Sequence, residues 1–137
     1  MYMLKQLSVA FAAGGFGGLL NSLTVWVFGA LGITAMLGVS IAPPLTHAWL
    51  YPRIVWGGLW GLLFLLPYLR HSWQLRGLFF SLAPTAAQLF IVFPFQAQKG
   101  YAGLELGALT PLFVVFFNLI WGLAASAWIR ACEDGGS

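Results

Sequence analysis

The positions of the charged residues constrain this chain more than any other feature of its sequence. Its 137 residues carry only six Lys or Arg and three Asp or Glu. Charge-free stretches cover residues 6–52, 54–69, 77–98 and 106–129. A helix that crosses a bilayer needs about 20 mainly apolar residues, because the hydrocarbon core is about 30 Å thick. The spacing therefore predicts a polytopic membrane protein and excludes a soluble enzyme, a nucleic-acid-binding protein and a disordered regulator.

The composition agrees with this class. Charged residues make up 7% of the chain, whereas a soluble domain carries about 25%. The net charge of +3 would suggest nucleic acid in a soluble protein, but these basic residues are scattered singly, as membrane topology predicts. The single cysteine, Cys132, excludes an internal disulfide and a metal site built from several cysteines.

The hydropathy pattern predicts an all-α fold, a four-helix transmembrane bundle that forms one domain over residues 1–137. We expect four spans, at about residues 7–30, 52–69, 77–95 and 111–129. Residues 31–51 are also apolar but contain Pro43 and Pro44. Irregular backbone in a membrane needs protein or water around its amides, so we expect this segment to be interfacial or re-entrant on the outer side. Whether the second span begins at Pro44 or Pro52 stays open.

The basic residues also predict an orientation. The connector at residues 70–76 is the most basic short segment, and by the positive-inside rule it faces the cytoplasm. Lys5 and Arg130 then lie on the same side, so that both termini are cytoplasmic. Lys99 and Glu105 fall in the opposite loop, where their charges nearly cancel.

Matching segments in the two halves predict an internal duplication. They occur in the same order: residues 18–23 with 77–82, residues 37–45 with 106–112, and residues 53–57 with 118–122. The first and third spans point the same way, so we expect a parallel repeat about an axis along the membrane normal. The alternative is chance recurrence of Leu, Gly and Trp in a very apolar chain.

Small residues recur one helical turn apart in three of the predicted spans. The pairs are Gly14 with Gly18, Gly57 with Gly61, and Gly122 with Ser126. Such pairs let helix backbones approach closely inside lipid. We favour packing within this bundle over packing against another chain.

A few polar side chains fall inside the charge-free segments or beside them: Asn21, Ser22, Arg53, Gln88 and Asn118. An unsatisfied polar group in hydrocarbon is costly, so each should face protein. In the predicted repeat Arg53 and Asn118 are equivalent, and we expect them to meet near the axis, joined by Asn21 or Gln88. A guanidinium there favours an anion or a polarised carbonyl. The alternative is that Arg53 snorkels to the outer headgroups.

The two histidines do not form a pair. His47 and His71 are 24 residues apart (71 − 47), about 36 Å at helical rise, so they belong to opposite membrane faces. We predict no metal site, no cofactor and no catalytic residues, and hence no enzyme. An axial contact from one histidine to a pigment stays open.

Three segments resemble small four-span bacterial inner-membrane proteins of the YagU-like kind: Trp56–Phe64, Arg76–Phe80 and Asn118–Leu123. The resemblance covers about residues 50–130. It implies a four-span fold in a bacterial inner membrane and says little about activity.

Two functions follow from these features. The first is a structural or accessory subunit of a membrane complex, which acts through helix packing with other membrane subunits or with copies of itself in the lipid bilayer. The alternative is a homo-oligomeric channel or a transporter of small solutes or anions. Two residues support it: Gln88, which is flanked by prolines, and Arg53, which could face the interior of the bundle.

Overall fold

The computed structural model describes residues 2–96 and 100–135, and this part of the chain is all-helical, without a strand. Its elements in order are α1 (Tyr2–Ala30), α2 (Ile33–Met36), α3 (His47–Gly61), the 3₁₀ helix η1 (Leu62–Leu65), α4 (Trp73–Ala87), the π-helix η2 (Gln88–Gln96), the 3₁₀ helix η3 (Tyr101–Leu106) and α5 (Thr110–Gly135).

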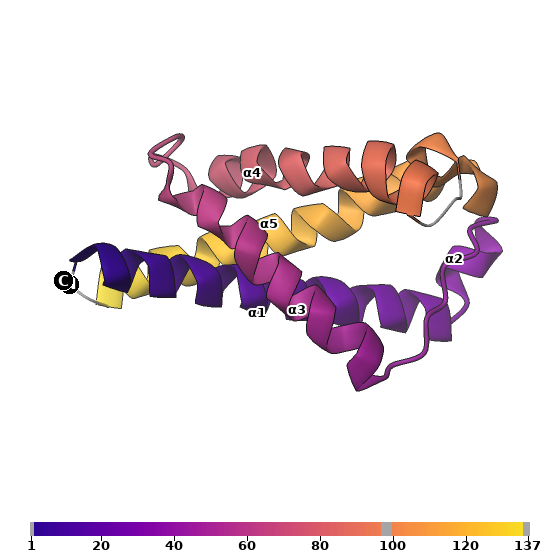
Figure 1. Cartoon of the computed structure of the whole chain (residues 1–137), viewed down its shortest axis with the longest axis horizontal. Helices are drawn as coiled ribbons and strands as arrows, with labels where there is room; N and C mark the ends of the chain where they lie inside the picture. The colour runs from indigo at the N-terminus through magenta and orange to yellow at the C-terminus, as the bar shows by residue number, and fades with distance from the viewer. Residues whose placement is uncertain (1, 97–99, 136–137) are drawn as a thin grey trace.

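Three helical segments are long and apolar enough to cross a membrane: Tyr2–Ala30, Trp73–Phe95 and Thr110–Glu133. α1 and α4 run away from the end of the molecule at which both termini lie, and α3 and α5 run back towards it (Figure 1). α1 packs against both α3 and α5, and α5 packs against α4. The chain is thus a helical membrane protein with an up-and-down arrangement.

α3 begins earlier and ends earlier than the predicted span at residues 52–69. The Thr46 hydroxyl accepts a hydrogen bond from the Trp49 backbone N–H at 3.2 Å, which caps a helix that starts at His47 and places Pro52 inside it. At the other end Leu66 is extended, with φ −74° and ψ 133°. This residue precedes a proline, which disfavours the helical conformation, so the helix does not reach residue 69.

α4 also begins earlier than predicted, inside the supposed connector. The Ser72 hydroxyl accepts from the Leu75 backbone N–H at 3.3 Å and caps a helix that starts at Trp73. The Trp73 carbonyl in turn accepts from the Ser126 hydroxyl of α5 at 2.7 Å. Arg76 therefore lies in the first turn of α4 rather than in a loop.

α4 changes into the π-helix η2 at Gln88, between the prolines at positions 84 and 94. Proline has no backbone N–H and crowds the preceding turn, so two prolines ten residues apart disturb the regular α-helical pattern. π-helical segments are rare and often occur at functional sites. Gln88 occupies the first position of this one.

Residues 31–46 form α2 and an extended strap at the end of the bundle opposite the termini (Figure 1). The buried Thr34 hydroxyl donates to the Ile41 carbonyl at 2.7 Å, and the Ser40 N–H donates to the Leu106 carbonyl at 2.8 Å. The backbone N–H groups of residues 37–40 all donate to protein carbonyls, as an irregular segment inside a membrane would require.

The glycines of α1 and α3 face each other where these helices cross. A Cβ added to Gly57 would lie 2.7 Å from the Gly14 carbonyl oxygen and 3.0 Å from the Gly18 Cα. A Cβ added to Gly61 would lie 2.7 Å from the Gly14 Cα. The two backbones touch directly, which maximises dispersion contact in lipid.

α4 and α5 meet in the same way. A Cβ added to Gly77 would lie 2.7 Å from the Gly122 carbonyl oxygen. In the predicted repeat Gly77 is equivalent to Gly18, and Gly122 is equivalent to Gly57. Gly18 and Gly57 are themselves in contact, so the glycines matched between the two halves make matching helix contacts. The parallel repeat itself stays a prediction.

Trp121 of α5 joins three helices at the centre of the bundle. Its indole Nε1 donates to the carbonyl oxygens of Gly14 on α1 and Gly57 on α3, at 3.1 and 3.3 Å. Its ring packs against Phe64, which in turn contacts Phe80 of α4. This aromatic cluster forms the core towards the end of the molecule at which the termini lie.

Candidate functional site

A charged side chain from α3 reaches into the bundle and binds α1. The Arg53 Nε donates to the Ser22 hydroxyl at 2.8 Å, and its Nη2 donates to the Asn21 Oδ1 at 2.7 Å. Both acceptors are buried residues on the inner face of α1. The close α1–α3 crossing makes this reach possible, because Gly18, one turn before Ser22, lies against the backbone of Arg53.

The hydrogen bonds continue from α1 across α5 to α4. The Asn21 Nδ2 donates to the Phe117 carbonyl at 2.7 Å and to the Asn118 Oδ1 at 3.3 Å. The Asn118 Nδ2 donates to the Thr85 hydroxyl at 3.1 Å and to the Gln88 Oε1 at 3.4 Å. One chain of polar side chains therefore connects α1, α3, α4 and α5 through the bundle.

The structure brings together the five polar residues singled out in the sequence: Asn21, Ser22, Arg53, Gln88 and Asn118. Asn21 bridges Arg53 and Asn118 by hydrogen bonds to both. Arg53 points towards α1 and not towards the chain's outer surface, because α1 offers it two buried oxygen acceptors.

Two members of this site were missed by sequence reasoning. Thr85 lies one turn before Gln88 on the same face of α4 and supplies the Asn118 partner. Trp49 lies one turn before Arg53, with its ring centroid 4.7 Å from the guanidinium carbon, a cation–π contact. Thr85 precedes Gln88 by three residues and Trp49 precedes Arg53 by four, spacings that put side chains on one helix face. This spacing is the sequence feature that could have identified them.

The charge of Arg53 has only neutral partners among the residues that the structure describes: a hydroxyl, an amide oxygen and an indole ring. An arginine inside a membrane bundle usually pairs with an acid or lines a water-filled cavity. The two acceptors of Arg53 on α1 are both neutral oxygens.

Arg53 lines a cavity of about 400 Å³ together with Asn21 and Gln88. The cavity also touches residues 40–43 and Leu106, which places it towards the end of the bundle opposite the termini (Figure 1). Much of the remaining wall is apolar: Val25, Phe93, Val114 and Phe117. A concave, mainly apolar space with a few convergent polar groups is the usual form of a small-molecule site.

The remaining predicted residues lie elsewhere. His47 begins α3 and contacts the Tyr51 ring, with the ring centroids 6.0 Å apart, whereas His71 lies in the turn before α4. The described residues contain no group of three or more His, Cys, Asp or Glu able to hold a metal ion. Lys99, predicted for the outer loop, is outside the described residues.

The interpretation of Arg76 as a topology-setting connector charge needs correction. Because the Ser72 cap starts α4 early, Arg76 is carried into the bundle and is only 6% exposed. Its guanidinium donates to the Phe64 carbonyl and, at 3.2 Å, to the Leu66 carbonyl, which ties α4 to the end of η1.

Comparison with known proteins gives no matching family model, curated protein or solved structure. What the site can bind is therefore inferred from the chemical groups of its own side chains. The guanidinium donates hydrogen bonds, and the amide and hydroxyl groups both donate and accept them; none of these groups changes protonation near neutral pH. The arrangement is suited to binding a polar or anionic molecule.

Proposed function

We propose that this protein binds a small anion or a carbonyl-bearing solute in the Arg53 cavity and carries it across the membrane. The single observation behind the proposal is a guanidinium with only neutral described partners on the wall of a cavity of about 400 Å³. Sites for small molecules commonly occupy about 300–1,000 Å³. The role is binding and transport rather than catalysis.

The cost of a charge in hydrocarbon supports an anionic ligand. Arginine within a membrane helix is rare because moving its charge out of water is expensive. Neutral hydrogen bonds offset only part of this cost, and an anion beside the guanidinium offsets more through a charge-assisted, bidentate contact. An asparagine-rich hydrogen-bonded chain across four helices then holds the guanidinium in place.

We propose that α3 and η1 together form a fourth membrane span. Fifteen α-helical and four 3₁₀ residues (His47–Leu65) extend about 30 Å at their normal rises, which matches the hydrocarbon thickness. Lys5, Arg70 and Arg130 line cavities at the end of the bundle at which the termini lie. By the positive-inside rule this end faces the cytoplasm of a bacterial inner membrane.

The lone cysteine gives a direct test of this orientation. Cys132 is exposed near the C-terminus, so in intact spheroplasts a membrane-impermeant maleimide should leave it unlabelled, and should label it after the membrane is opened. Labelling in intact spheroplasts would place the termini outside. A Cys132→Ala protein is the background control. In that protein, Ala108→Cys places a cysteine at an exposed position at the opposite end, and it should be labelled already in intact spheroplasts.

We further propose that transport uses a homo-oligomer. The glycine crossings and Trp121 fill the bundle between the cavity and the end with the termini. A single copy therefore encloses the site but no continuous path, and a second copy supplies the missing wall.

An accessory-subunit function has weaker support. That hypothesis depends on small-residue faces being available to another chain, but Gly14, Gly57, Gly61, Gly77 and Gly122 are in contact with other helices of the same chain. Purification in mild detergent distinguishes the two functions, because a stable homo-oligomer supports transport and co-purification of a defined larger complex supports the accessory function.

The transport proposal predicts a specific effect of the Arg53 charge. Arg53→Gln should lower solute binding and flux at least about tenfold, because a hydrogen bond to a charged group contributes about 1.5–3 kcal/mol. Arg53→Lys should retain a measurable part of the activity, since it keeps the positive charge but loses the planar guanidinium that donates two parallel hydrogen bonds. Asn118→Leu should reduce flux by misplacing Asn21.

The measurement is flux into liposomes across a panel of chloride, nitrate, acetate and lactate, with folding checked by circular dichroism and gel filtration. Thr24→Val is the control, because the Thr24 hydroxyl donates to the Leu20 carbonyl of its own helix, and its flux should match the unmodified chain. No flux for any solute, or equal flux in Arg53→Gln, would contradict the proposal.

A further inference from the structure

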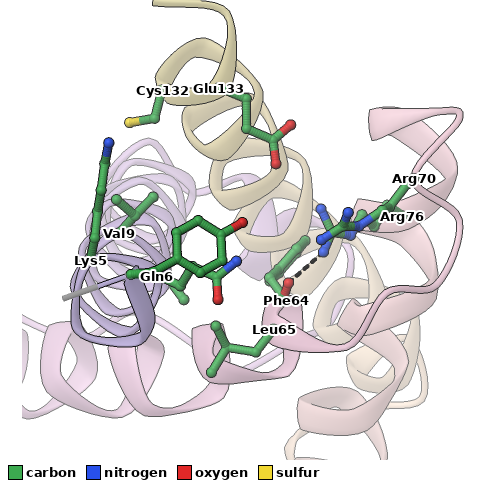
Figure 2. Close-up of a pocket in the computed structure, with 11 residues that line it drawn as sticks. Lys5, Gln6, Val9, Phe64, Leu65, Arg70, Arg76, Cys132 and Glu133 are labelled. Atoms are coloured by element: carbon green, nitrogen blue, oxygen red, sulfur yellow. Dashed lines mark hydrogen bonds between the residues drawn. The ribbon is translucent and has the colours of Figure 1, made fainter. Parts of the chain in front are cut away.

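A second polar region lies at the opposite end of the molecule from the Arg53 cavity. Two cavities, of about 480 and 250 Å³, lie at the end where the termini lie, and both are lined by Arg70, Arg76 and Glu133. Figure 2 shows the larger one, with the side chains of Arg70 and Arg76 side by side on one wall and Glu133 on α5 above them. This region is independent of the proposed transport site.

Arg76 is the buried member of this region. It is only 6% exposed, yet its guanidinium has just two described acceptors, both backbone carbonyls of the η1 end. Its Nε is buried and has no partner within the described residues. A buried donor without an acceptor carries a desolvation cost, and in a native structure it needs an explanation such as an absent ion or ligand.

Positive charge converges around this guanidinium. Arg70 and Glu133 are both close enough to Arg76 to act on it electrostatically. Lys5 adds a further positive charge to the larger cavity, and Arg130 lines the smaller one. Two adjacent arginines repel each other unless an anion lies between them, and Glu133 supplies only one negative charge.

The two cavities differ in the side chains around the shared arginines. The larger one has an apolar wall made by Val9, Ala10, Phe64 and Leu65. The smaller one is lined mainly by polar side chains, among them Ser126. A ligand at the arginines therefore meets polar surroundings on one side and apolar surroundings on the other, which suits a molecule with an anionic head and an apolar body.

We propose that this end of the bundle binds the phosphate group of an anionic phospholipid, held by Arg70 and Arg76, with its glycerol and acyl part along the Val9–Phe64 wall. Basic pockets between membrane helices on the cytoplasmic side are typical sites for anionic lipid headgroups. Arginine suits phosphate, because its planar fork donates two parallel hydrogen bonds.

The test is native mass spectrometry of the full chain in mild detergent, titrated with phosphatidylglycerol and with phosphatidylcholine of the same acyl length. Phosphatidylglycerol should bind at least about fivefold more tightly, the effect of about one favourable basic contact. Arg70→Gln should remove most of that preference, and Arg70→Lys should keep part of it. Arg70 is exposed, so these variants leave the core intact, whereas Arg76→Gln also removes the bonds to η1.

Glu133→Gln is the matched variant of opposite sign. It removes the negative charge that lines both cavities and should strengthen phosphatidylglycerol binding. Equal binding of the two lipids, or an unchanged preference in Arg70→Gln, would overturn the proposal. Displacement of bound lipid by millimolar inorganic phosphate, with no displacement by chloride, would overturn the lipid assignment in favour of a free phosphate site. None of these results depends on solute flux.

Discussion

Replacing Trp121 by alanine is expected to destabilise the folded bundle by about 3–5 kcal/mol, the usual range for removing a large buried aromatic side chain. Trp121 is 3% exposed and contacts three other helical segments, so the lost volume cannot be filled by lipid. The loss is one of dispersion contact, because burial from lipid into a bundle gains no hydrophobic energy.

The two hydrogen bonds of the Trp121 indole add a smaller contribution. Trp121→Phe keeps most of the packing but removes the donor to the carbonyls of Gly14 and Gly57. We expect it to cost about 1–2 kcal/mol. Comparison of the Ala and Phe variants therefore separates packing from hydrogen bonding.

The measurement is thermal or SDS-induced unfolding in detergent, followed by circular dichroism. Trp56→Ala is the matched control, because Trp56 is also a tryptophan on a long helix but is 62% exposed. Its removal should cost less than about 1 kcal/mol. If Trp121→Ala and Trp56→Ala have the same unfolding midpoint, Trp121 does not hold the helices together as described above.

The second large effect is expected from a single methyl group. Gly14→Ala should destabilise the bundle by about 1–3 kcal/mol, the cost of overpacking a tight contact. The added Cβ would lie 2.7 Å from the Gly61 Cα and closer still to the Gly57 carbonyl oxygen. Both are backbone atoms, so the clash is relieved only by moving α1 away from α3.

The neighbouring residue provides the control for this prediction. A Cβ added to Gly15 would meet nothing nearer than the Ile54 Cγ2 at 3.6 Å, which is ordinary contact. Gly15→Ala should therefore be neutral, or stabilising by up to about 1 kcal/mol through helix propensity. Equal destabilisation by both alanines in the same unfolding assay would show that helix propensity, rather than the crossing, is responsible.

The Gly14 variant should also affect the polar site. The same crossing places the backbone of Arg53 against Gly18, and a Cβ at Gly18 would lie 2.8 Å from the Arg53 carbonyl oxygen. Separation of α1 from α3 lengthens the reach from Arg53 to Asn21 and Ser22. Solute binding should fall in Gly14→Ala and stay unchanged in Gly15→Ala.

Part of the site was predictable from the sequence. A polar side chain in hydrocarbon must find a partner, so Asn21, Arg53, Gln88 and Asn118 had to face protein wherever their helices lay. The order of their connection was not predictable. Asn21 bridges Arg53 to Asn118 because α1 lies between α3 and α5, and helix adjacency is a property of packing.

The prediction that Arg76 lies in a connector is wrong because of a local feature, the helix cap at Ser72. Arg76 follows a serine cap that starts α4 at Trp73. Hydropathy averaged over a membrane thickness does not resolve such a cap, so the pattern predicts a loop at Arg76. Its burial depends on the η1 carbonyls that accept from it, and these come from a segment that only the fold brings near.

The sequence by itself determined that this chain is helical and resides in a membrane, because the spacing of its few charges is matched to the thickness of hydrocarbon, a property of local composition. The tertiary structure alone decided which glycines are in contact, which oxygens accept hydrogen bonds from Arg53, and which charged side chains lie at the end with the termini. Each of these depends on distances between helices that are far apart in sequence, and those distances are set by backbone contacts at the glycine crossings.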